Sequence, residues 1–164
     1  MDIMTHDEVI ASLMKWLRYR KQSKNSVILP KYRFGGYECD CLELTQDGFA
    51  IDYEVKTIKE RSVSDLRKKK HSDKLKCNYM VYVVSKWDKT KDRIPDVFGI
   101  IEYDSYLGCF EVIRKPTILN SEVQEIDYKN ICVQLSRQMA SQFASFQIVK
   151  QMNSKLTESV NFFK

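Results

Sequence analysis

Residues 38–56 of the chain, ECDCLELTQDGFAIDYEVK, have the pattern of a β-hairpin whose open end collects ionisable side chains. In its first strand, Glu38 and Asp40 share a face at the end remote from the turn. In its second strand, every other residue belongs to a face that becomes charged toward the strand end: Ala50, Asp52, Glu54 and Lys56. Clustered carboxylates with one ammonium group are the residue types that bind a hard metal ion and stabilise charge on a phosphate.

The length of the turn decides whether these acids meet. A three-residue loop at 46–48, with Gly48 supplying a positive φ, predicts the cross-strand pairs Leu44–Ala50, Leu42–Asp52, Asp40–Glu54 and Glu38–Lys56. Two carboxylates directly opposite each other are destabilising unless a cation lies between them, and Mg²⁺ is the natural candidate. Two alternatives stay open. The face could be solvated with Lys56 neutralising the acids, or a two-residue loop could shift the register and separate Asp40 from Glu54.

A second cluster of charge follows the hairpin. The segment SVSDLRKKKHSDKLK predicts a polar, basic helix, on which Arg67, Lys70 and Lys74 form one row. A basic helix directly after this hairpin is well placed to meet a phosphate backbone. The alternative is an exposed helix face on which lysines only maintain solubility.

The remaining pattern predicts the elements that position these residues. A helix begins at a capping box formed by Thr5 and Glu8, and a short strand, 26–29, ends at Pro30. After the hairpin and the basic helix come a fully buried strand at 79–85, a second hairpin around Gly108 and a helix over about 127–152. This order predicts a single α/β domain with a mixed sheet flanked by helices, spanning residues 1–152, and a tail at 153–164.

Composition narrows the classes of protein that need to be considered. The chain has 164 residues and a net charge of +5, from 27 Lys and Arg against 22 Asp and Glu, which favours an anionic partner only mildly. Its five cysteines form no C-x-x-C pair and only two histidines accompany them, so neither a zinc site nor a disulfide framework is expected. We find no signal peptide and no apolar run near the ~20 residues that cross a bilayer, so the expectation is a cytoplasmic protein without a membrane partner.

Asp40, a turn, and then Glu54-Val55-Lys56 resemble the signature of the PD-(D/E)XK, or restriction-endonuclease-like, nuclease superfamily. The likeness extends through YECDCLEL, YEVKTIKERSVSDLRKKKH and YMVYVV, and over residues 36–116 it is similar to small phage and bacterial proteins described as hypothetical nucleases or DNA-repair proteins. The resemblance implies an αβββαβ core, here with an added hairpin and a C-terminal helix. One departure is Cys39, which stands where the family usually has proline.

The resemblance also implies roles for individual residues. Asp40 and Glu54 would be metal ligands, the Val55 carbonyl an additional ligand, and Lys56 would position the attacking water or stabilise charge on the phosphate. An acid from the first helix is often used as well, and Glu8 is the candidate, although its capping-box role explains it equally. The implied activity is Mg²⁺- or Mn²⁺-dependent hydrolysis of DNA, endonucleolytic in preference to exonucleolytic. The alternative is a non-catalytic nucleic-acid-binding or scaffold domain, and a homodimer is left open.

Overall fold

The protein is described by a computed structural model over residues 4–20, 25–34, 37–57, 77–89, 91–122, 129–137, 139–141 and 143–145. Two compact units divide the chain, Met1–Glu125 and Ile126–Lys164. In the second unit the described residues are helical, as the sequence predicts for this part of the chain. The predicted basic helix, with Arg67, Lys70 and Lys74, lies outside the described residues.

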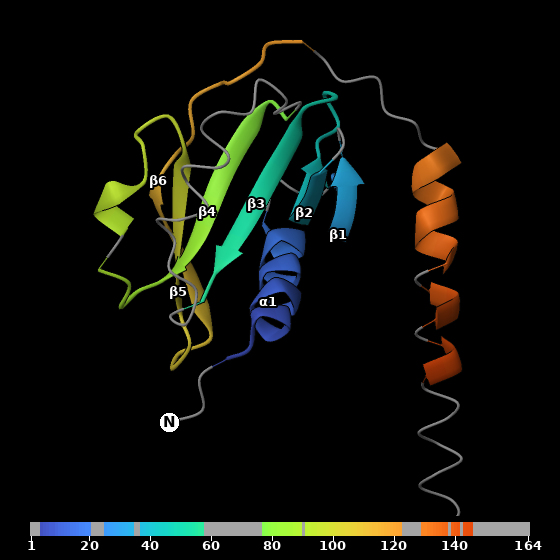
Figure 1. Ribbon diagram of the computed structural model, residues 1–164, viewed down its shortest axis with the longest axis horizontal. Helices are drawn as coiled ribbons and strands as arrows, with labels where there is room; N and C mark the ends of the chain where they lie inside the picture. The colour runs from blue at the N-terminus through green and yellow to red at the C-terminus, as the bar shows by residue number, and fades with distance from the viewer. Residues whose placement is uncertain are drawn as a thin grey trace, which may run out of the picture. The chain divides into compact units, whose positions relative to one another are not determined.

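The first unit is a six-stranded mixed sheet with a helix on one face (Figure 1). The helix is α1 (His6–Tyr19), and the strands follow one another in sheet order as β1 (Val27–Phe34), β2 (Tyr37–Leu44), β3 (Ala50–Lys56), β4 (Tyr79–Ser85), β5 (Gly99–Asp104) and β6 (Cys109–Arg114). β3, β4 and β5 are mutually parallel, whereas β1, β2 and β6 are antiparallel to their neighbours. The predicted α/β class with a mixed sheet is therefore confirmed.

α1 begins where the sequence predicts. The Thr5 side chain accepts a hydrogen bond from the backbone N–H of Glu8, and the Glu8 carboxylate accepts one from the backbone N–H of Thr5. The apolar stripe of α1 packs on β1, β2 and β3. Its buried members are Val9, Ile10, Leu13 and Leu17, each of which stabilises the fold by roughly 1.5–3 kcal/mol on burial.

The two predicted hairpins and the buried strand are also present. β4 lies between two parallel neighbours, and all but its first residue are buried, which explains its nearly continuous apolar sequence. The hairpin of β5 and β6 turns at Gly108, where φ is 63°. β6 is the edge strand and is largely exposed.

The prediction that Pro30 ends the first strand is wrong. β1 continues through Pro30 to Phe34 and pairs with β2 along almost its whole length. Proline lacks a backbone N–H, but β1 is the other edge strand of the sheet, where that missing donor costs no inner ladder bond. No helix among the described residues has the length and apolar character needed to cross a membrane.

Candidate active site

The β2–β3 hairpin has the predicted register near its turn. Thr45 and Phe49 close the loop, Gly48 has a φ of 81°, and Leu44 faces Ala50 while Leu42 faces Asp52. The backbone ladder then ends at the pair Cys41–Tyr53. The predicted pairs Asp40–Glu54 and Glu38–Lys56 are therefore not part of the ladder, and Glu38 lies opposite Arg33 of β1 instead.

The Asp40 side chain occupies the place where the ladder has ended. Its Oδ2 atom accepts a hydrogen bond of 2.9 Å from the backbone N–H of Val55. A side chain of β2 thus supplies the acceptor for a backbone donor of β3, because a backbone N–H that loses its ladder partner needs another one. The contact brings the Asp40 carboxylate to the middle residue of the Glu54-Val55-Lys56 triplet.

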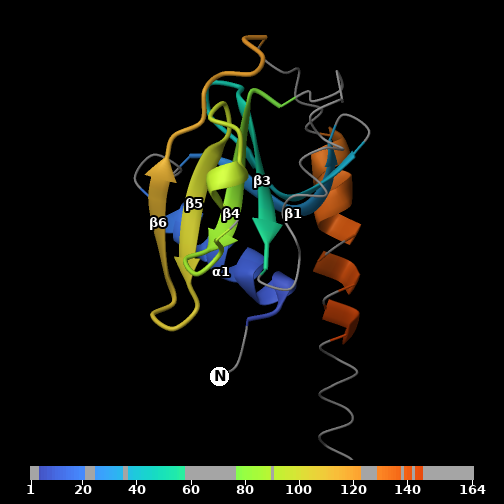
Figure 2. The ribbon, with the colours of Figure 1, turned by 60° about the vertical axis from the view of Figure 1, so that its left-hand side comes forward.

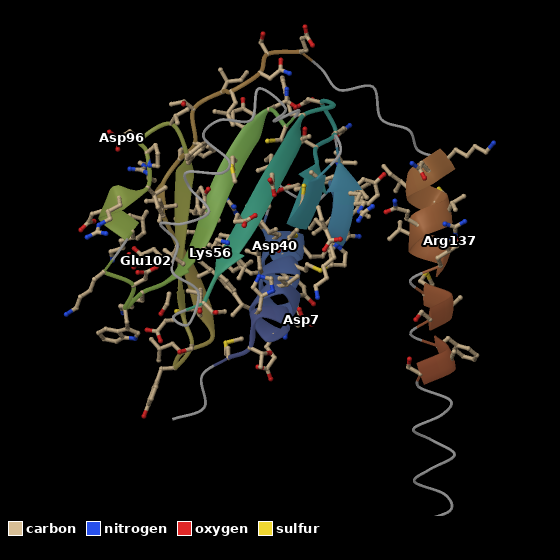
Figure 3. The ribbon with its side chains drawn as sticks, viewed as in Figure 1. Asp7, Asp40, Lys56, Asp96, Glu102 and Arg137 are labelled. Atoms are coloured by element: carbon tan, nitrogen blue, oxygen red, sulfur yellow. The ribbon has the colours of Figure 1, made fainter. Side chains whose placement is uncertain are left out.

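Glu54 and Lys56 form a buried ion pair on the face of β3 opposite α1. The Lys56 Nζ atom is 2.8 Å from Glu54 Oε1, and the two side chains are only 7% and 11% exposed, respectively. Tyr53 and Val55, which alternate with them, pack against α1. Figure 3 shows Asp40 and Lys56 near each other on neighbouring parts of the sheet.

Electrostatics indicate that the two acids affect each other. Burial, and after it the negative charge of Glu54, raises the pKa of the Asp40 carboxyl above its ordinary value. The Val55 N–H, His6 and Lys56 act in the opposite direction and favour the carboxylate. A cation at this position would relieve the same conflict that raises the pKa of Asp40.

α1 contributes a different residue from the one that the sequence suggested. Glu8 directs its carboxylate to the backbone N–H and the hydroxyl of Thr5, at 2.7 and 2.9 Å, so its capping role is the one seen. His6 at the start of α1 instead places Nε2 3.4 Å from Asp40 Oδ2. Sequence reasoning missed His6. The available signal was that a capping box engages Glu8 and leaves His6 and Asp7 as the other polar residues of the first turn.

Lys31 is a second residue that no pattern in the sequence singled out. It has a φ of 46°, an uncommon conformation for a residue with a side chain, and it is left out of the β1–β2 ladder at the point opposite Asp40. Its Nζ atom is 2.8 Å from Asp7 Oδ1. This contact, and then the charges of Glu38 and Asp40, raise the pKa of Lys31. Positive charge therefore borders the carboxylates from β1 as well as from Lys56.

The donor chemistry suits a hard cation in part. The Asp40 and Glu54 carboxylates and the Val55 carbonyl are oxygen ligands of the kind that bind Mg²⁺ together with water. Over the described parts of the chain, however, no three His, Cys, Asp or Glu side chains gather closely enough to hold a metal ion. A metal bound here would thus depend on two carboxylates, one backbone carbonyl and water or phosphate oxygens.

No protein-family model matches the chain, and no curated protein matches its sequence. The fold is similar to that of a solved structure, the SPO1766 protein of unknown function from Silicibacter pomeroyi. The TM-score is 0.60 at 16% sequence identity, and the superposition covers 90% of this chain and 94% of that one. The comparison shows that this mixed-sheet fold occurs in another protein over nearly its full length.

Proposed function

We propose that the chain is a metal-dependent nuclease that hydrolyses phosphodiester bonds of DNA. The observation that carries the proposal is the hydrogen bond from Val55 N–H to Asp40, which brings a carboxylate of β2 beside the Glu54-Val55-Lys56 segment of β3. Two acids and a lysine at the open end of one hairpin are the arrangement that the PD-(D/E)XK resemblance implies. The proposal also includes membership of the PD-(D/E)XK superfamily, a preference for endonucleolytic cleavage and a cytoplasmic location.

Each residue has a role in the proposed reaction. Asp40, Glu54 and the Val55 carbonyl would hold Mg²⁺ or Mn²⁺, which supplies Lewis-acid stabilisation of the phosphoryl oxygens and a more acidic water. Lys56, held by Glu54, would place an ammonium charge against the phosphate as negative charge develops on it. His6 contacts Asp40 and would fix the orientation of its carboxylate.

The test is a cleavage assay on single-stranded, duplex and branched DNA with Mg²⁺ or Mn²⁺, repeated in excess chelator. We expect cleavage that requires the divalent ion and is lost in Asp40→Asn and Lys56→Met. Glu8→Gln is the matched control, because Glu8 faces Thr5, and it should retain cleavage. Activity in excess chelator, or in Asp40→Asn, would refute the mechanism.

A second candidate is a nucleic-acid-binding or scaffold domain that keeps this fold without turnover. The observation that favours it is the missing third acidic or histidine ligand among the residues that the structure describes. Such a domain would bind DNA equally well with Mg²⁺ or chelator and would leave every substrate of the panel intact.

A further inference from the structure

Three large apolar side chains are exposed at the end of the sheet where β4 and β5 finish. Trp87, just after β4, is 67% exposed, and Tyr106 and Leu107, in the turn between β5 and β6, are 80% and 72% exposed. Figure 2 shows that the carboxyl ends of β3 and β4 and the β5–β6 turn all lie at this end of the sheet. Exposed apolar side chains gathered in one region indicate an interaction site.

The Asp104 carboxylate connects the turn after β4 with the turn between β5 and β6. Asp104 Oδ1 accepts hydrogen bonds from the backbone N–H groups of Tyr106 and Leu107, at 2.9 and 3.2 Å. Asp104 Oδ2 accepts one of 3.3 Å from Lys86 Nζ, and the backbone N–H of Lys86 donates to the Tyr103 carbonyl at 2.9 Å. The aromatic side chains thus extend from turns that are already ordered, so binding a ligand there would cost little conformational entropy.

The same region carries positive charge. The segment 86–93 has four cationic residues and two acidic ones, and Lys89 and Arg93 are exposed. The Lys86 Nζ atom is 5.8 Å from the centroid of the Trp87 ring. Exposed aromatic rings flanked by ammonium and guanidinium groups are the combination that binds single strands, because bases stack on the rings and phosphates meet the cations.

This surface and the candidate active site lie toward the same end of the sheet. Lys56 faces Val84 in the parallel β3–β4 pair, and Trp87 follows Val84 by three residues at the same end of the sheet. Glu102, on β5, faces Val84 from the other side and binds Lys91 of the connecting segment. A nucleic-acid strand that reaches Lys56 would therefore approach the end of the sheet that carries these side chains.

We infer that Lys86, Trp87, Lys89, Tyr106 and Leu107, the Trp87 surface, bind unpaired nucleotides of a single-stranded nucleic acid. The inference deepens the proposed function, since it rests on that proposal for the reaction and names the strand state of the substrate. Bases would stack on Trp87 and Tyr106, while Lys86 and Lys89 would meet the phosphates. Because the contacts are to base faces and phosphates, little preference for sequence is expected.

The test measures binding of a fluorescently labelled oligo-dT of about 20 nucleotides, and of a duplex of equal length, by anisotropy in excess chelator. Trp87→Ala and Tyr106→Ala should each weaken oligo-dT binding about tenfold, within the range for loss of one stacked base. Trp87→Phe keeps an aromatic ring and should lose less of the affinity for oligo-dT. Tyr19→Ala is the matched control, because Tyr19 is an 81% exposed aromatic residue on α1, and it should bind as the wild type does.

A spectroscopic measurement places the contact independently of those variants. Trp16 and Trp87 are the two tryptophans of the chain, and Trp16 packs against Phe110, with ring centroids 5.4 Å apart. With 5-fluorotryptophan incorporated, oligo-dT should shift the ¹⁹F resonance that is missing in Trp87→Phe and leave the other one in place. Duplex DNA should shift it less.

The outcomes separate this inference from the proposed function. Oligo-dT binding that Trp87→Ala weakens, together with no cleavage in Mg²⁺, would uphold the Trp87 surface and refute the nuclease. Metal-dependent cleavage, with oligo-dT affinity unchanged in both alanine variants, would refute the surface alone. Equal affinity for duplex and oligo-dT in the wild type and in both variants would also overturn the inference and leave a protein as the partner for these side chains.

Discussion

Glu54 is both a candidate metal ligand and a structural partner of Lys56. The register expected from the sequence sets Glu54 against Asp40, so that removing either acid would relieve repulsion. In the structure Glu54 is also the partner of Lys56, and both side chains are buried. Removing one member of a buried ion pair takes from the other an opposite charge in contact with it, in a place that water solvates poorly.

Glu54→Ala should therefore lower the free energy of unfolding by about 3 kcal/mol, measured by urea denaturation in chelator. Replacing both charges, with Glu54→Leu and Lys56→Met together, should recover most of that loss, because a buried pair exchanged for apolar side chains is often neutral. Asp96→Ala, which breaks the pair with Arg114 at a fully exposed carboxylate, is the control and should cost under about 1 kcal/mol. Wild-type stability in Glu54→Ala would show that the pair does not hold β3.

Replacing Asp40 should stabilise the folded chain, whereas replacing Glu54 should destabilise it. Asn at position 40 can still accept the hydrogen bond from Val55, and it removes a charge that burial and Glu54 disfavour. Because the folded-state pKa of Asp40 lies above its ordinary value of 3.8, ionisation of Asp40 destabilises the folded chain as the pH rises through that range. Asp40→Asn should thus unfold at a higher temperature than the wild type at pH 7, in chelator, and the difference should disappear at pH 3. A less stable Asp40→Asn at pH 7 would contradict this reading.

At the scale of elements, one buried side chain connects β3, β4 and the segment after β6. The Asn78 Oδ1 atom accepts a hydrogen bond from the Ala50 N–H at 2.7 Å, and its Nδ2 atom donates to the carbonyls of Asn120 and Glu122, each at 2.7 Å. Asn78 itself is fully buried. It fixes the start of the strand that carries Glu54 and Lys56.

Asn78→Ala should destabilise the protein by roughly 3 kcal/mol, because it leaves buried backbone groups without these partners. The measurement is chemical denaturation monitored by circular dichroism. Asn120→Ala removes a side-chain bond to the exposed backbone N–H of Glu122 and is the matched control, with an expected loss below about 1 kcal/mol. Equal losses in the two variants would contradict the role assigned to Asn78.

At the scale of the whole molecule, the net charge of +5 bears on how DNA would be held. Neutralising Arg67, Lys70 and Lys74 together should flatten the log–log dependence of DNA binding on salt by about 0.9 per lost duplex phosphate contact, or about 0.7 for single strands. Neutralising Lys68, Lys69 and Lys76 should flatten it less, because these residues do not continue that row of the predicted helix. Wild-type slopes in both triple variants would show that the basic run is a solvated face and that DNA binds elsewhere.

Local patterns determined much of the fold from the sequence alone. The capping box at Thr5, the apolar stripe of α1, the turn at Gly48 and the apolar run of β4 each depend on neighbours within a few residues, and all four are seen. The first two cross-strand pairs of the hairpin also followed, because the loop length decides them. Alternation along β3 likewise placed Glu54 and Lys56 on one face.

Tertiary structure decided what the acids of the hairpin contact. The end of the β2–β3 ladder, the bond from Val55 to Asp40 and the approach of His6 depend on how α1 and two strands meet, which no local spacing encodes. The passage of β1 through Pro30 depends on the edge position of that strand, and no local pattern predicted the left-handed conformation of Lys31. Sequence spacing therefore selected Asp40, Glu54 and Lys56, whereas packing between distant segments determined their partners and their charge balance.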